Sequence, residues 1–223
     1  MRKLFYRLYA WFVKITAVIP YYLCFRTKTY YEDKKVQSKR IKGKAIVISN
    51  HRSVWDVAVM LFLFWRRTPR CLIAEIMFQR NAIFSWFLKS LGGIKVDRNT
   101  HDFSFVGKCC DILDHNGLVE IYPEARLPKA DEQRPLPFKP SAAYIALLSG
   151  APIVPVYTNG SYFQKERARV IVGKPIDVRA MYDERLSETE NLEKISEELR
   201  NIIIRLGHEL YIKKEQKTKK EKE

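Results

Sequence analysis

From residue 45 onward, short apolar runs alternate with longer segments in which apolar residues recur every three or four positions. The short runs, rich in Ile and Val, are typical of buried strands. They cover residues 45–49, 71–74, 94–96, 118–122, 153–157 and 169–172. The longer segments are typical of helices and cover residues 54–65, 77–91, 103–115 and 142–148. This alternation predicts an α/β fold with a largely parallel central sheet flanked by helices.

The C-terminal part of the chain predicts one more helix. Ser187 and Glu190 form a capping box, and apolar residues follow at helical spacing between residues 192 and 210. We expect that apolar face to pack on the sheet. Residues 213–223 are mostly Lys and Glu, which bury little apolar surface, so we expect a disordered tail there.

The first 25 residues predict a separate apolar helix. A helical stripe runs along it, formed by Leu4, Leu8, Trp11, Ile15, Val18 and Tyr22. On a helical wheel, a narrow basic edge gathers Lys3, Arg7, Lys14 and Tyr21. A helix with these two faces is typical of a segment that lies in the membrane interface, with its basic residues at the depth of the head groups. A helix that covers the core of the same domain is the alternative.

A membrane-spanning helix is a weaker interpretation, because Arg7, Lys14 and Pro20 interrupt the apolar stretch. The patterns together divide the chain into three parts. Residues 1–30 are expected to form the interfacial arm, residues 31–212 the α/β domain, and residues 213–223 the tail.

The charge of the chain is concentrated in its N-terminal part. Residues 1–44 carry twelve Lys and Arg against two acidic residues, a net +10 of the total +15. Such a segment suits an anionic surface, either a membrane or a nucleic acid. The four cysteines have no C-x-x-C spacing, which favours a reducing cytosolic environment and thiols packed in the core. We expect no bound metal and no cofactor.

The candidate chemistry follows the strand at residues 45–49. Asn50 and His51 come directly after this strand, and Asp56 follows five residues after His51. His51 is therefore expected in a strand-to-helix turn, at the carboxyl end of a strand, where open α/β sheets bind their ligands. An imidazole beside a carboxylate can act as a general base toward a hydroxyl group. The same residues also fit a plain capping box from Ser53 to Asp56, and this spacing alone fits either reading.

Three further blocks follow in order, at residues 92–98 (GGIKVDR), 120–126 (EIYPEAR) and 151–157 (APIVPVY). Together with residues 50–56 (NHRSVWD), they resemble the four motif blocks of the glycerolipid acyltransferase family. The best-known members of this family are the 1-acylglycerol-3-phosphate acyltransferases. The resemblance covers residues 45–157, about half of the chain.

The resemblance implies a membrane-associated O-acyltransferase on the cytoplasmic face. It would transfer a fatty acyl group from acyl-CoA or acyl carrier protein to lysophosphatidate, giving phosphatidate. His51 would be the general base and Asp56 would orient it. Arg98, Glu124 and Arg126 would hold the acceptor, and Asn50 would contribute to the same binding site or orient the turn. Its partners would be the acyl thioester, the lysophospholipid and an anionic membrane, without nucleic acid.

The third block departs from the family pattern F-P-E-G-T-R-S. Here Ala125 stands where the glycine is usual, and Arg126 comes one residue early. These departures leave the reaction class in place and leave the acceptor open between lysophosphatidate, glycerol 3-phosphate and another lysophospholipid. A non-catalytic, basic nucleic-acid-binding module is the alternative from a different class.

Overall fold

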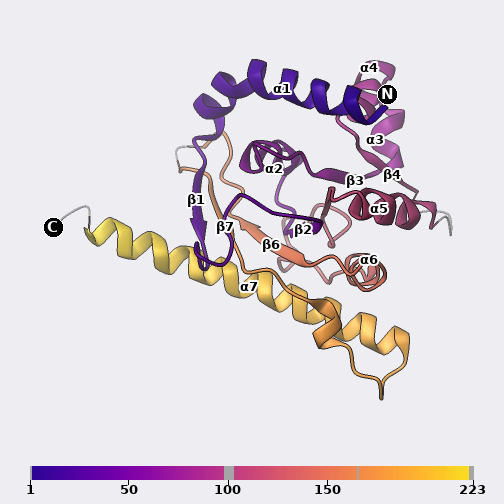
Figure 1. Cartoon of the computed structure of the whole chain (residues 1–223). Helices are drawn as coiled ribbons and strands as arrows, with labels where there is room; N and C mark the ends of the chain where they lie inside the picture. Colours follow the sequence, from indigo (N-terminus) through magenta and orange to yellow (C-terminus); the bar gives the residue numbers. More distant parts are fainter. Residues whose placement is uncertain (1, 98–102, 165, 221–223) are drawn as a thin grey trace.

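The computed structural model describes residues 2–97, 103–164 and 166–220, and its sheet lies between two layers of helices (Figure 1). In this described part the sheet has seven strands in the order β1-β7-β6-β2-β5-β3-β4. Their bounds are β1 Lys28–Tyr31, β2 Ala45–Ser49, β3 Arg70–Ala74, β4 Ile94–Val96, β5 Leu118–Ile121, β6 Ile153–Thr158 and β7 Arg169–Val172. The block from β6 to β4 is parallel, whereas β7 is antiparallel to β6 and pairs with β1 in parallel. The predicted α/β class with a largely parallel sheet is confirmed.

The helices cover the two faces of the sheet. Their bounds are α1 Arg2–Phe25, α2 Asp56–Leu63, α3 Glu75–Gln79, α4 Ala82–Ser90, α5 Ser104–Asp114, α6 Ser141–Ser149 and α7 Glu188–Lys220, with a short 3₁₀ helix at Val178–Met181. On one face, Ile46 and Ile48 of β2 join a core shared with α5, α6 and α7. On the other face, Val47 packs in a core shared with α1 and α2. Successive side chains of β2 point to opposite faces of the sheet, and all five are buried, so β2 lies between the two cores.

The structure corrects several predicted boundaries. The helix expected over residues 77–91 is two helices, because Asn81 accepts a hydrogen bond from the amide of Phe84 and starts α4 there. The sheet begins at Lys28, inside the segment expected to be a separate arm. The expected disordered tail is helical through Lys220, since α7 continues with ion pairs such as Lys213 to Glu209. Lys213 also donates to the carbonyls of Tyr31 and Glu32.

The orientation of α1 differs from the one its helical wheel predicts. Lys14 was expected at head-group depth, but it is 1% exposed and points into the domain. Its ammonium donates to the carbonyls of Phe64 and Trp65 at 3.2 and 2.9 Å, and to Thr68 Oγ1 at 3.0 Å. Burial lowers the pKa of Lys14 to about 8. The cation thus binds the carbonyls at the end of α2, where the helix dipole is negative.

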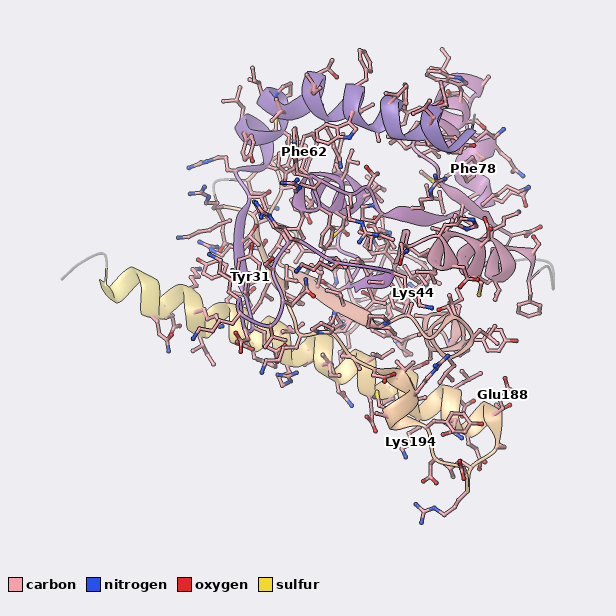
Figure 2. All side chains as sticks on the ribbon, viewed as in Figure 1. Tyr31, Lys44, Phe62, Phe78, Glu188 and Lys194 are labelled. Atoms are coloured by element: carbon pink, nitrogen blue, oxygen red, sulfur yellow. The ribbon has the colours of Figure 1, made fainter. Side chains whose placement is uncertain are left out.

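Aromatic contacts hold the inner face of α1 along its length. Tyr9 contacts Trp86 of α4, with ring centroids 5.3 Å apart, and Tyr21 stacks on Phe62 of α2 at 4.1 Å. Figure 2 shows Phe62 in the space between α1 and α2. The outward face of α1 is apolar and exposed, and it carries Leu4, Phe5, Leu8, Phe12, Ile15, Ile19, Tyr22 and Leu23. The segment Leu4–Phe25 is long and apolar enough to cross a membrane, by length and composition.

Candidate active site

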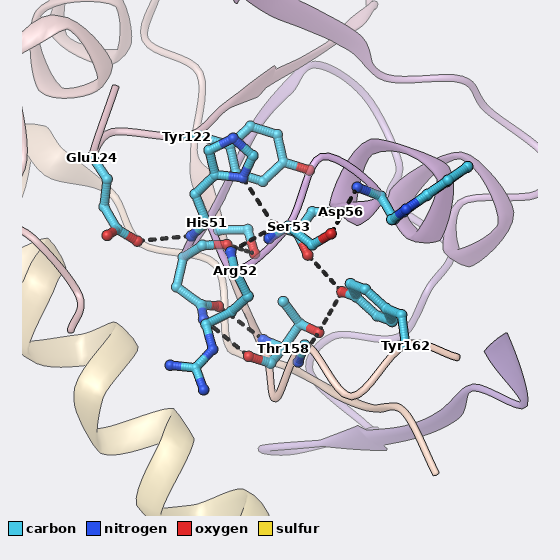
Figure 3. Close-up of polar contacts among 12 residues, drawn as sticks. His51, Arg52, Ser53, Asp56, Tyr122, Glu124, Thr158 and Tyr162 are labelled. Atoms are coloured by element: carbon cyan, nitrogen blue, oxygen red, sulfur yellow. Dashed lines mark hydrogen bonds and ion pairs between the residues drawn. The ribbon is translucent and has the colours of Figure 1, made fainter. Parts of the chain in front are cut away.

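Three neighbouring strands bring the polar groups of the site together at one edge of the sheet. His51 follows β2, Glu124 follows β5, and Tyr162 follows β6. These strands are parallel and adjacent, so the residues that follow their carboxyl ends meet, as Figure 3 shows. The sequence-based expectation for the position of His51 is therefore confirmed.

His51 and Asp56 form a hydrogen-bonded pair. His51 Nδ1 lies 2.9 Å from Asp56 Oδ2, and Asp56 is fully buried in the first turn of α2. Because a carboxylate accepts, Nδ1 carries the proton and Nε2 is left as the basic nitrogen. Among the described residues, no hydrogen bond uses His51 Nε2. The imidazole remains 18% exposed, so Nε2 is available to a substrate proton.

The carboxylate of Asp56 also fixes the turn that precedes it. Its Oδ2 atom accepts from the backbone amides of Arg52 at 2.7 Å and Ser53 at 2.9 Å. The turn therefore has the backward half of a capping box, while the same oxygen holds His51. Ser53 is not the N-cap, because α2 begins at Asp56 with Trp55 as its N-cap, and the Ser53 hydroxyl accepts from the Trp55 amide at 3.3 Å.

Tyr162 completes the set of groups around Asp56. Its hydroxyl donates to Asp56 Oδ1 at 2.6 Å and lies 2.8 Å from Thr158 Oγ1. Burial raises the pKa of Tyr162 far above its ordinary value, so its phenol stays a donor. Sequence reasoning missed this residue, because it lies beyond the four motif blocks and no local pattern distinguishes it from other tyrosines.

A buried acid lies behind the imidazole. The His51 ring stacks on Tyr122, with centroids 4.4 Å apart and planes inclined by 27°. The Tyr122 hydroxyl donates to Glu120, which is 1% exposed on β5. Burial raises the pKa of Glu120 to about 8, so this carboxyl is mainly protonated at neutral pH. A neutral acid avoids a second buried negative charge near Asp56.

Glu124 and Asn50 lie at the site and bind backbone groups. Glu124 Oε1 accepts from the amide of His51 at 2.7 Å, and Oε2 accepts from the amide of Leu136 at 2.8 Å. Burial raises the pKa of Glu124. The Asn50 amide exchanges two hydrogen bonds with the backbone of Thr158, at 2.9 and 2.8 Å, and is buried. Both side chains thus hold the turn around His51, and Asn50 faces the protein rather than an open binding site.

Arg126 of the third block was expected to bind the acceptor, and in the structure it has a partner within the protein. Arg126 is exposed and forms a bidentate pair with Glu132, at 2.6 Å for each nitrogen. Ala125 keeps the left-handed backbone of the glycine it replaces, with φ of 60°. Arg98 lies outside the described residues.

Among the residues that are described, no group of three or more His, Cys, Asp or Glu side chains has the arrangement of a metal site.

Comparisons with known proteins identify the family of this chain. The sequence profile described as Acyltransferase matches residues 27–159, which is more than half of the chain and contains β1 to β6 with the whole His51 turn. The chain belongs to the Acyltransferase family. The glycerolipid acyltransferase resemblance read from the four blocks is thereby confirmed.

Two relatives illustrate how far the likeness extends within the Acyltransferase family. The human 1-acyl-sn-glycerol-3-phosphate acyltransferase beta is 25% identical over 138 residues, covering 61% of this chain and 49% of the human protein. This chain thus matches about half the length of that relative. The crystal structure of the 1-acyl-sn-glycerophosphate (LPA) acyltransferase PlsC from Thermotoga maritima superimposes with a TM-score of 0.60. It is 17% identical, and the match covers 92% of this chain and 81% of PlsC. That likeness supports the fold alone.

Proposed function

We propose that this protein is an O-acyltransferase that moves a fatty acyl group from an acyl thioester to the free hydroxyl of lysophosphatidate, giving phosphatidate. The observation that carries the proposal is the His51–Asp56 pair, in which the imidazole is 18% exposed and Nε2 has no hydrogen-bond partner among the described residues. The family membership and the name of the human relative support the same reaction.

The proposed reaction needs no nucleophile from the protein. His51 Nε2 takes the hydroxyl proton as the alcohol oxygen attacks the thioester carbonyl, and Asp56 stabilises the imidazolium that forms. When the tetrahedral intermediate collapses, the carbon–sulfur bond breaks and the imidazolium returns its proton to the leaving thiolate. The products are the ester and the free thiol of coenzyme A or acyl carrier protein.

We assign Glu124 and Asn50 as positioning residues in this scheme. Glu124 fixes the backbone of His51 and the loop that contains Leu136, while Asn50 joins the ends of β2 and β6. Arg98 and Arg126 remain the proposed phosphate ligands, because a guanidinium binds phosphate oxygens in a bidentate fashion. Arg126 must exchange Glu132 for the acceptor, so we expect Arg98→Ala to raise the acceptor KM more than Arg126→Ala.

The decisive experiment is an assay with purified protein, a labelled acyl thioester and a panel of acceptors. The panel contains lysophosphatidate, glycerol 3-phosphate and lysophospholipids with larger head groups. His51→Ala is expected to lower the rate by about 10²–10⁴, and Asp56→Asn should remove most of the activity. His208→Ala is the matched control, because His208 is exposed on α7. Near-normal turnover by His51→Ala would refute the mechanism, and a preferred acceptor other than lysophosphatidate would replace the proposed substrate.

We also propose that the arm of residues 1–30 lies in the plane of a membrane interface, on the cytoplasmic face. The inner face of α1 packs on the domain from Tyr9 to Phe25. This packing favours a helix that lies in the membrane plane over a helix that spans the membrane. Removal of α1 would uncover the buried core, so substitution is the cleaner test. Leu8→Asn with Ile15→Asn should reduce sedimentation with anionic vesicles, because both side chains are exposed. Unchanged sedimentation would exclude α1 as the membrane-binding face, and stronger sedimentation with RNA would favour the nucleic-acid alternative.

A further inference from the structure

A basic pocket lies at the edge of the sheet opposite His51. The pocket has a volume of about 320 Å³ and is lined by Arg66, Arg67 and Arg70, with Tyr6 and Trp11 of α1 above them. It continues into a wider hollow of about 730 Å³, which shares Tyr6 and Arg70. Strands β3 and β5 begin at this edge, whereas His51 follows the carboxyl end of β2. A five-residue strand such as β2 spans about 16 Å, so the pocket is separate from the catalytic turn.

The three arginines of the pocket have different environments. Arg67 is committed to the protein, since its guanidinium donates to the carbonyls of Ile41, Gly43 and Asn116. Arg70 lies over the ring of Tyr6, with Cζ 4.8 Å from the centroid. Arg66 is exposed at the mouth of the pocket. Within the described part of the chain, neither Arg66 nor Arg70 has a carboxylate oxygen within 4.0 Å.

Positive charge therefore exceeds negative charge in this region. Lys95, Lys108 and His115 line the wider hollow, and its acidic side chain among the described residues is Asp111. Lys95 forms an ion pair with Glu75. Burial lowers the pKa of Arg70, and the charge of Asp111, which acts in the opposite direction, is the smaller effect. A partly buried guanidinium without an anion is unfavourable, and a bound anion with several oxygens would relieve it.

We propose that this pocket binds a phosphate group, held by Arg66 and Arg70, at a site separate from the catalytic turn. A guanidinium group can donate two parallel hydrogen bonds to phosphate oxygens. The Tyr6 ring packs against the guanidinium of Arg70 and orients it. Two sources can supply this chemistry. One is the head group of an anionic phospholipid, because α1 forms the roof of the pocket and exposes its apolar face on the other side. The other is a soluble phosphate ester.

The test measures binding to the full-length protein by calorimetry, with hydrogen–deuterium exchange to locate the site. One arm uses inorganic phosphate and the other uses dihexanoyl phosphatidylglycerol below its micellar concentration. We expect slower exchange around residues 66–70 and 91–94. Arg70→Gln should weaken binding about ten- to hundredfold, and high salt should weaken it as well. Arg185→Gln is the control, because that side chain is 88% exposed beside the start of α7.

Each outcome is decisive. Binding in both arms identifies a phosphate site open to soluble ligands, and binding in the lipid arm alone identifies a head-group site. Arg66→Gln provides a second variant if Arg70→Gln does not fold, because Arg66 is exposed. The proposal is overturned by no binding in either arm, by binding that both variants leave unchanged, or by protection confined to residues 50–56. Because the readout is binding, it is independent of whether the protein transfers acyl groups.

Discussion

Asp56 is held between a phenol and an imidazole: Tyr162 donates to Oδ1 at 2.6 Å and His51 contacts Oδ2 at 2.9 Å. The two oxygens of one buried carboxylate are thereby oriented by groups from two different strand ends. Phe25 of α1 packs on Tyr162, with ring centroids 5.4 Å apart. Helix α1 is thus linked to His51 through three successive contacts, from Phe25 to Tyr162, from Tyr162 to Asp56 and from Asp56 to His51.

Tyr162→Phe should lower kcat about tenfold or more and leave both KM values nearly unchanged, because the variant removes one hydrogen bond to a charged group. The reason is loss of orientation of Asp56, and not loss of a substrate contact. Tyr182→Phe, at an exposed tyrosine, is the control. Steady-state kinetics together with a melting curve will separate the effect from unfolding. A tenfold rise in either KM with an unchanged kcat would contradict the positioning role.

Glu120→Gln should change how stability depends on pH. The pKa of Glu120 in the folded protein is about 8, above the ordinary 4.5, so the folded state binds the proton more tightly. Its contribution to stability is complete below about pH 4.5 and is lost as pH rises to about 8. The slope is at most about 1.4 kcal/mol for each pH unit. Gln mimics the protonated acid, so the variant should exceed the wild type in urea unfolding at pH 8.5 and show a smaller difference at pH 5.

Ala125→Gly should stabilise the protein by about 0.5–1 kcal/mol, because Ala in the left-handed region is strained and the flexible unfolded glycine offsets part of the gain. The backbone of Ala125 has φ of 60°. Ala130→Gly in the same loop is the matched control, since Ala130 is not among the residues with positive φ. Chemical unfolding of both variants will check the difference. A loss of stability in Ala125→Gly equal to that of the control would show that the left-handed conformation carries no strain.

Lys14→Met should lower the free energy of unfolding by about 1–3 kcal/mol, because buried carbonyls lose a charged donor. Methionine keeps an unbranched apolar chain one atom shorter than lysine, so the packing of α1 on α2 is retained while the hydrogen bonds from the ammonium to Phe64 and Trp65 are lost. Lys89→Met, at an exposed position on α4, is the control. Limited proteolysis should cut α1 faster in Lys14→Met. Equal cleavage rates in the two variants would show that the ammonium does not hold α1 in place.

The strands of the central block were predictable because short runs rich in Ile, Val and Leu mark them, as parallel strands buried on both faces require, although Lys95 interrupts β4 and Glu120 interrupts β5. β1 was not predictable in this way. Its sequence Lys-Thr-Tyr-Tyr forms no apolar run, and it lies at the edge of the sheet in register with β7, with Lys28 opposite Arg169. Only the tertiary fold brings those segments together.

The His51–Asp56 pair was predictable because the residues are five apart in one turn. Two other features depend on distant segments. Tyr162 reaches Asp56 across 106 positions of sequence, and Lys14 reaches Phe64 across 50. A helical wheel assigns a lysine to the polar outside, and nothing local to Lys14 signals the carbonyls at the end of α2 that reverse this assignment.

The pairing of β1 with β7 joins an early segment of the chain to a late one, so it can form only late in synthesis. The carbonyl of Arg26, just before β1, accepts from Arg167, which is translated 141 positions later. At a synthesis rate of about 5–20 residues per second, α1 waits roughly 7 to 28 s outside the ribosome before its neighbouring strand can close the sheet. During that interval β1 has no β7 to pair with, and the sheet is incomplete at this edge. The exposed apolar face of α1, which we propose to bind a membrane, is therefore made before the sheet and the turn at His51 are complete.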